Sequence, residues 1–351
     1  MQSGFFLGAN SKNGFCSKYH TLIDLKDAAR VFILKGSPGC GKSTFMRTVS
    51  QSLNLDTCNI YCSSDPDSLD AVIFPSLGVA LVDGTAPHIV EPTYPLAVEE
   101  YINLGSSIDQ DKVKARRAEI IETTDRYKRQ FGRVYRLTAC AGLLYDDMQQ
   151  IASRGIDHAR LCKKAKGIVA RELRPTGHTG KIHERFLSAI SPKGFITLFD
   201  TISALADRVY ALEDSYGVGT DLLVALCDSA LALGHTIYAC YSPLCPERLE
   251  HLILPEARLA FVTANKRTFD QLQPDKRMHL DAMLDQTYLR ANRGKLRFAK
   301  SLSAELIQAA CEELANGKRI HDELESLYHP CIDFDKITTA AKKLAKELST
   351  Q

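Results

Sequence analysis

The sequence has no tryptophan and no long apolar segment, and these absences exclude several classes of protein. No apolar run approaches the ~20 residues that a membrane-spanning helix needs, so a membrane partner is not expected. The first residues, MQSGFFLGANSKNGF, lack the basic region and long apolar region of a signal peptide. The 44 Lys and Arg nearly balance the 42 Asp and Glu, for a net charge of +2. This balance gives no support for nucleic acid as a partner.

Disulfide and zinc-binding motifs are also missing. The eleven cysteines form no CxxC pair. The close pairs Cys58/Cys62 and Cys240/Cys245 have no histidine at metal-ligand spacing. Most cysteines lie in apolar runs, which favours small core side chains. We therefore expect a reduced, cytoplasmic protein.

A glycine-rich stretch near the start of the chain carries the strongest functional signal. Residues 30–35, RVFILK, have the β-branched and aromatic composition of a buried strand, and residues 44–53 show helical periodicity. Between them, GSPGCGKS fits the P-loop pattern GxxxxGK[ST]. The predicted nucleotide-binding residues are Gly36, Ser37, Pro38, Gly39, Cys40, Gly41, Lys42, Ser43 and Thr44.

The residue types in this stretch suit a phosphate site. Gly36, Gly39 and Gly41 let the backbone curl so that N–H groups point at phosphate oxygens, and the following helix N-terminus adds positive charge. Lys42 is expected to reach the β- and γ-phosphates, and the Ser43 hydroxyl to bind Mg²⁺. The predicted ligands are therefore ATP and Mg²⁺.

The second half of the chain repeats the first. FLGANSKNGF (6–15) matches FLSAISPKGF (186–195), and LKGSPGCGKSTF (34–45) lies over LEDSYGVGTDLL (212–223). Residues 59–84 match 236–264, and YDDMQQIASRGID (145–157) matches HDELESLYHPCID (321–333). The period is about half the chain, which indicates a duplicated domain rather than a solenoid.

The two copies differ at the residues expected to hold phosphate and metal. Lys42 becomes Thr220, Ser43 becomes Asp221 and Asp83 becomes Thr263, while two of the loop glycines are kept as Gly217 and Gly219. We expect the first copy to bind nucleotide and the second to be a regulatory or scaffolding module.

Several polar residues follow predicted strands near the first loop. GVALVDG (78–84) reads as a strand ending in Asp83, the candidate metal-binding Asp; no Glu follows it to activate water. Asp65 and Asp67 follow the strand CNIYC and could orient water or a substrate hydroxyl. Alternatively, Asp65 caps a helix that has Pro66 at its first position.

The loop after Asp83 contains further candidates. Thr85 and His88 could reach the γ-phosphate, although a lone loop histidine is more often structural. In the second copy, Thr268 stands near the His88 position. NKRTFD (265–270) comes near the guanine-reading pattern [NT]KxD, but it belongs to the degenerate copy.

The middle of the chain has a helical pattern. Residues 106–174 are rich in Lys and Arg interleaved with acidic residues, which is typical of a solvated helix face; a partner surface or an arginine that reaches the phosphates is the alternative. PTGHTGKIHE (175–184) reads as the linker between the modules.

Three pieces of the chain carry a resemblance to a known family. KGSPGCGKST, CSSDPDSLDAVIFPSLGVALVDGTAPH and FLSAISPKGF resemble bacterial, mainly Firmicutes, P-loop ATP-binding proteins with two similar tandem modules. The resemblance covers nearly the whole chain and implies ATP binding at residues 36–44, with Asp83 near the metal. The family's cellular role is unassigned, so it supplies no substrate. Its second module often has its own P-loop, from which this chain departs.

The sequence thus predicts an α/β protein of two tandem P-loop NTPase-like modules with mainly parallel sheets and helical extensions. Residues 1–180 would be the active module with a basic helical extension, and 181–351 the degenerate one. The expected function is Mg²⁺-dependent ATP binding with slow hydrolysis, in which Lys42, Asp65, Asp67 and His88 are the catalytic candidates. A small-molecule kinase and a nucleotide-gated interaction protein with an unknown small-molecule or protein partner are the alternatives. A nucleic-acid-dependent ATPase is the weakest of the alternatives.

Overall fold

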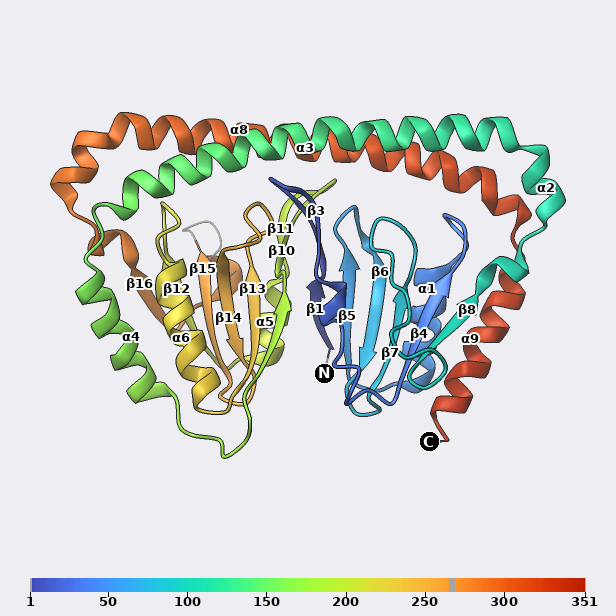
Figure 1. Ribbon diagram of the computed structural model, residues 1–351, viewed down its shortest axis with the longest axis horizontal. Coiled ribbons are helices and arrows are strands. Elements are labelled where there is room, and N and C mark those ends of the chain that lie inside the picture. The colour runs from blue at the N-terminus through green and yellow to red at the C-terminus, as the bar shows by residue number, and fades with distance from the viewer. Residues whose placement is uncertain (1, 265–268, 351) are drawn as a thin grey trace.

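The computed structural model describes residues 2–264 and 269–350 and has an α/β fold with two mixed sheets of mostly parallel strands (Figure 1). In the first sheet β6 is antiparallel to both of its neighbours, and the other neighbouring strands are parallel. Its strand order is β1 (Gln2–Phe6), β5 (Thr57–Cys62), β6 (Asp65–Phe74), β7 (Val79–Asp83), β4 (Arg30–Lys35) and β8 (Glu99–Asn103).

The second sheet has the same arrangement. Its order is β9 (Lys181–Arg185), β13 (Thr236–Tyr241), β14 (Leu249–Leu254), β15 (Leu259–Ala264), β12 (Arg208–Glu213) and β16 (Lys276–His279), with β14 antiparallel to its neighbours. Segments matched by the sequence repeat therefore form equivalent strands. The predicted linker 175–184 is wrong over residues 181–184, because these pair with β13 in the edge strand β9.

Most local predictions around the first glycine-rich loop are confirmed. Residues 30–35 form β4, helix α1 (Lys42–Leu53) follows the loop, and the strand before residue 84 is β7. The alternative of a helix capped by Asp65 is wrong, since strand β6 begins there. Pairing with β5 on one side and β7 on the other outweighs the local capping signal.

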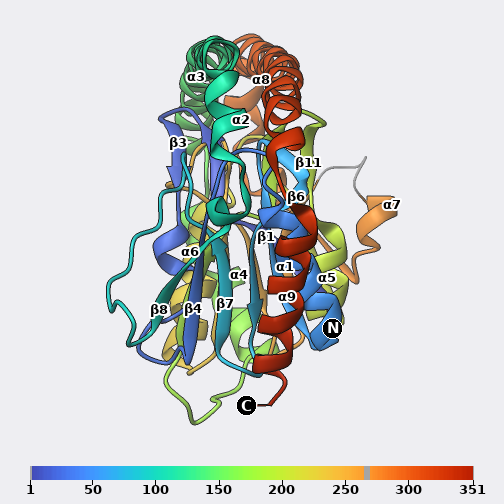
Figure 2. The same cartoon turned by 90° about the vertical axis from the view of Figure 1, so that its right-hand side faces the viewer.

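The helical region consists of α2 (Gln110–Ala115), α3 (Arg117–Ser153) and α4 (His158–Glu172). Helix α3 pairs along its length with α8 (Gln286–Tyr328), and the pair crosses above both sheets (Figures 1 and 2). Side chains from α3, α8 and the segment after β13 share a small apolar core, and the Ser303 hydroxyl donates to the Ala141 carbonyl at 2.9 Å. These two long helices therefore connect the two sheets.

Each half of the sequence gives a helix to the sheet of the other half. The last helix, α9 (Phe334–Leu348), packs on α1 of the first sheet, as Figure 2 shows, and its Ile337 and Leu344 join the core of that sheet. Helix α4, from the first half, packs on α6 (Thr220–Ala232) of the second sheet. Each sheet is therefore covered by a helix from the other half of the sequence, because α3 and α8 carry the chain from one sheet to the other.

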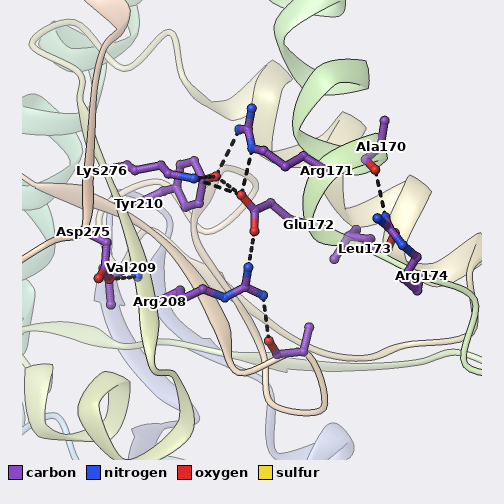
Figure 3. Close-up of polar contacts among 11 residues, drawn as sticks. Ala170, Arg171, Glu172, Leu173, Arg174, Arg208, Val209, Tyr210, Asp275 and Lys276 are labelled. Atoms are coloured by element: carbon purple, nitrogen blue, oxygen red, sulfur yellow. Dashed lines mark hydrogen bonds and ion pairs between the residues drawn. The ribbon is translucent and has the colours of Figure 1, made fainter.

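An ionic cluster fastens the end of α4 to the second sheet (Figure 3). The Glu172 side chain, only 3% exposed, contacts Arg171, Arg208 and Lys276, and the Tyr210 hydroxyl donates to it. Burial alone would raise the pKa of Glu172, but these donors outweigh it and lower the pKa to about 2. At the first sheet, Arg30 makes the corresponding ion pair with Glu347 of α9.

Two hairpins lie between the sheets. They are β2–β3 (Gly8–Ser11 and Gly14–Ser17) and β10–β11 (Ser188–Ser191 and Gly194–Thr197), and Phe6 and Phe186 exchange backbone hydrogen bonds beside them. The Lys193 ammonium reaches the Asp67 carboxylate in the first half at 2.6 Å, and Lys12 reaches Glu247 in the second half at 2.5 Å. The remaining short elements are α5 (Phe199–Leu205), α7 (Phe269–Leu272) and 3₁₀ turns at 19–21, 104–107, 280–283 and 329–331.

Two further findings concern the cysteines and the lengths of the helices. All eleven cysteines lie in the described part of the chain and are free thiols, and seven of them are buried. Within residues 2–264 and 269–350, the model contains no helix with the length and apolarity to cross a membrane.

Candidate functional site

The first glycine-rich loop, residues 36–44, lies at the carboxyl end of β4 and leads directly into α1. Gly39 and Gly41 have φ angles of +66° and +81°, a region that side-chain-bearing residues rarely adopt. A Cβ at Gly36 would collide with the Cys40 thiol, which is fully buried beneath the loop. The glycines thus allow a tight curl of backbone at the sheet edge where ligands bind in α/β folds.

Lys42 and Asp83 meet at this edge because their strands are adjacent and parallel. β4 pairs with β7, so the residues after β4 and the last residue of β7 lie side by side. The Lys42 Nζ atom is 3.6 Å from Asp83 Oδ2 and donates to the Ser37 carbonyl at 3.1 Å. Both side chains are largely buried, at 11% and 13% exposed, so their interaction is only partly screened by solvent.

Ser43 and Thr85 complete the polar surroundings of these two residues. The Ser43 hydroxyl oxygen accepts the backbone N–H of Leu69 at 2.9 Å, which fixes it beside β6. Thr85 donates both its backbone N–H and its hydroxyl to Asp83 Oδ1, at 2.9 and 2.6 Å. Asp83 is thereby held in one orientation with Oδ2 turned to Lys42.

His88 is buried against Tyr19 and Asp70. Its ring stacks on Tyr19 at a centroid distance of 4.4 Å, and its Nε2 atom is 3.9 Å from Asp70 Oδ1. That nitrogen is buried and has no hydrogen-bond partner among the described residues. Tyr19 donates to Asp70 at 2.6 Å, and burial raises the pKa of the Asp70 carboxyl. In the second copy, Thr268, which stands near the His88 position, and most of NKRTFD (265–270) lie outside the described residues.

The two aspartates at the start of β6 have different surroundings. Asp67 is 74% exposed and paired with Lys193 of the other half, so its carboxylate serves the contact between the hairpin and the first sheet. Asp65 is 26% exposed and lies 3.5 Å from the Lys318 ammonium of α8. Of the two, Asp65 is the one that contacts α8, the helix whose end rests on the first glycine-rich loop.

The sequence did not predict that α8 and α9 cover the first glycine-rich loop. A Cβ on Gly39 would lie 3.0 Å from the Glu325 Cβ and 3.1 Å from His329 Nε2, so the end of α8 rests on the loop. A Cβ on Gly41 would lie 3.7 Å from the Phe334 ring of α9. The repeat contained a signal, because 321–333 matches 145–157, but it does not reveal which sheet either segment covers.

The second glycine-rich loop, residues 214–220, is closed by its own side chain. Asp214, at the position of Gly36, accepts backbone N–H groups from Tyr216, Val218 and Gly219 at 3.2, 3.0 and 2.7 Å. Burial raises the pKa of Asp214, and the three N–H donors counter that rise. Gly219 has φ −74°, unlike Gly41 with +81°. The second loop thus bonds an internal carboxylate and has a different backbone.

Cys40 lies within the first loop but is shielded. Its thiol is fully buried, and burial raises its pKa, an effect that the nearby Lys42 only partly offsets. A raised pKa leaves little thiolate at neutral pH, so Cys40 fits a packing role under the loop.

Comparisons with known protein families, with curated proteins and with solved structures gave no match.

Proposed function

We propose that the chain is a P-loop protein that binds ATP with Mg²⁺ at residues 36–44 and hydrolyses it slowly. The observation that carries the proposal is the contact between Lys42 and Asp83, with Ser43 next to Lys42 in the chain, beside a left-handed glycine loop at the carboxyl end of β4. A backbone curl, a lysine, a hydroxyl and a carboxylate are the groups that a triphosphate and its metal require. The preference for ATP over GTP rests on the family resemblance.

Each side chain has a separate task in this proposal. The Lys42 ammonium exchanges its contacts with Ser37 and Asp83 for the β- and γ-phosphate oxygens, where it stabilises the negative charge of the transferring group. The Ser43 hydroxyl and Asp83 carboxylate are hard oxygen donors that suit Mg²⁺. When bound, the metal would neutralise charge on the phosphates. Thr85 keeps Asp83 oriented for this purpose.

The second module is proposed to bind no nucleotide. Its loop N–H groups already bond the Asp214 carboxylate, and Thr220 replaces the lysine. An incoming phosphate would have to displace a buried carboxylate that is covalently attached to the loop.

The test is calorimetric titration with ATP, GTP and ADP in magnesium, on the wild type and on Lys42→Ala. We expect one ATP per chain, lost in the variant together with hydrolysis. Two ATP per chain would contradict the proposed inactivity of the second loop. ATP binding and turnover that survive Lys42→Ala would overturn the assignment of the first.

A nucleotide-gated interaction protein is the second candidate, favoured by the contacts of α8. Its early part meets the second loop, where Lys300 donates to the Ser215 carbonyl, and its end covers Gly39 of the first. A change at one loop could shift this helix and be sensed at the other. In that case ATP should change hydrogen exchange at 214–220, even in a variant without turnover; unchanged exchange there would exclude it.

A further inference from the structure

Helix α8 runs across both sheets and ends on the side of the first sheet (Figure 1), and its last turns contact the first loop. Glu325 packs against Gly39, and His321, one turn earlier, has its Nδ1 atom 3.7 Å from Glu325 Oε1. Both side chains are about three-quarters buried, with 26% of His321 and 29% of Glu325 exposed. The end of α8 thus brings a carboxylate to the first loop, with an imidazole beside that carboxylate.

The surroundings prepare this pair for proton transfer. Burial lowers the pKa of His321, an effect that Glu325 opposes and Lys318 assists, and the ring packs 5.1 Å from Tyr127 of α3. The His321 Nδ1 atom faces the Glu325 carboxylate, so the ring can hold that carboxylate in place. The Lys318 ammonium contacts both Asp65 and Asp322, so this cluster already contains its positive charge and needs no metal ion.

The second loop supplies an internal comparison. There α3 takes the place of α8: a Cβ on Gly217 would collide with Tyr145, and Gln149 donates to the Gly217 carbonyl at 3.2 Å. In the sequence repeat Tyr145 matches His321 and Gln149 matches Glu325. The helix over the second loop therefore has the uncharged Tyr145 and Gln149 at the positions where the helix over the first loop has His321 and Glu325.

We propose that Glu325 is the base that activates the attacking water in ATP hydrolysis, with His321 as its positioning residue. The proposal rests on the function proposed above and supplies the acidic group that is missing after Asp83. The water oxygen forms a bond to the γ-phosphorus while the bond from that phosphorus to the β–γ bridging oxygen breaks. ADP leaves with that electron pair, and the water proton passes to Glu325, then to solvent.

The experiment measures ATP binding by calorimetry and steady-state turnover on the wild type, Glu325→Gln and the matched control Glu323→Gln. Glu323 lies two residues away on the same helix, is 52% exposed and pairs with Arg126. We expect Glu325→Gln to keep its ATP affinity within about threefold and lose 10²–10⁴-fold in kcat, the usual range for a general base. The control should match the wild type.

The outcomes separate the two proposals. A wild type that binds no ATP contradicts the proposed function itself. If the wild type binds and hydrolyses ATP but kcat of Glu325→Gln stays within threefold of the wild-type value, the role of Glu325 alone is overturned. The same conclusion follows if Glu325→Gln loses only ATP affinity. If Glu325→Gln fails to fold, Glu325→Asp is measured instead, with at least a tenfold loss of kcat expected.

His321 is tested by a readout that a packing role would not move. If it positions Glu325, His321→Gln should lower kcat about tenfold and shift the acidic limb of the kcat–pH profile, with unchanged ATP affinity. An unshifted profile would leave Glu325 without its positioning residue and overturn that half of the proposal.

Discussion

The Asp214 carboxylate accepts the backbone N–H of Gly219 at 2.7 Å, across a loop whose counterpart in the first half has glycine at the aspartate position. The loop N–H groups of the second half therefore bond a carboxylate of the loop itself. Under the proposed function, the replacement of Lys42 by Thr220 and the presence of Asp214 act in the same direction, because each would lower the affinity of the second loop for phosphate.

The first prediction concerns this carboxylate. Replacing Asp214 with Asn leaves only one acceptor oxygen for three N–H donors, and it should lower the free energy of unfolding by about 1–3 kcal/mol. The measurement is urea denaturation at neutral pH. Asp228→Asn, an exposed position on the adjoining helix α6, is the control and should change stability by less than about 0.5 kcal/mol. Equal effects of the two variants would contradict the bonding described for Asp214.

The second prediction is a pH dependence at Glu250, the counterpart of Asp70. Burial first, and then the nearby Asp214, raise the pKa of Glu250 to about 8, whereas the unfolded chain has an ordinary value near 4.5. The folded state therefore binds this proton more tightly, and its contribution to stability is lost as the pH rises from about 4.5 through 8.

Glu250→Gln removes that ionisation. The variant should be more stable than the wild type by about 2–4 kcal/mol at pH 9 and nearly equal to it at pH 5. Chemical denaturation at the two pH values provides the measurement, and Glu305→Gln, exposed on α8, provides the control. A stability difference that does not depend on pH would show that Glu250 titrates normally.

The third prediction separates two roles for Asp67. Its carboxylate is exposed and paired with Lys193, so Asp67→Asn should cost less than about 1 kcal/mol of stability and leave ATP turnover within about twofold. A double-mutant cycle with Lys193→Gln measures the pair directly. A hundredfold loss of turnover would instead support the catalytic role that the sequence suggested for Asp67.

Sequence reasoning was sufficient for the elements around the first glycine-rich loop, but it did not identify the neighbours of Asp65 and Asp67. The strand, loop and helix from residue 30 to 53 were predicted because their signals are local: β-branched residues, glycines at fixed spacing and helical periodicity. The neighbours of Asp65 and Asp67, Lys318 and Lys193, lie far away in the chain and were not predicted.

The exchange of α4 and α9 was unpredictable for a related reason. Each helix has an apolar face that would fit either sheet, and the choice depends on the lengths of α3 and α8, which span both sheets. Periodicity indicates that a face is buried, but it does not identify its partner.

The fourth prediction follows from this exchange. Ile337→Ala on α9 removes a buried side chain from the core of the first sheet and should cost about 2–4 kcal/mol. Leu161→Ala, its counterpart on α4, should cost a similar amount in the core of the second sheet. With ATP bound, thermal melting should rise less in Ile337→Ala than in Leu161→Ala, because only the first core supports the loop. Equal rises would show that α9 does not affect ATP binding.

The fifth prediction concerns thiol reactivity. Cys140 and Cys162 are exposed, whereas Cys40 is fully buried and burial raises its pKa. In the native protein a maleimide should label Cys140 and Cys162 first, and Cys40 only on unfolding. Mass spectrometry of peptides after timed labelling measures this order. Early labelling of Cys40 would mean that the loop opens readily.

The placement of α9 also determines when the chain can complete its fold. The strands and glycine-rich loop of the first sheet precede the second sheet in the chain, but Ile337 and Leu344, which fill the core of the first sheet, are translated only after all the strands of the second sheet. A nascent chain that ends before α9 therefore leaves one face of α1 uncovered and Gly39 without its helical cover. The first glycine-rich loop therefore has all of its neighbours only in a molecule whose second half has already been translated and folded alongside it.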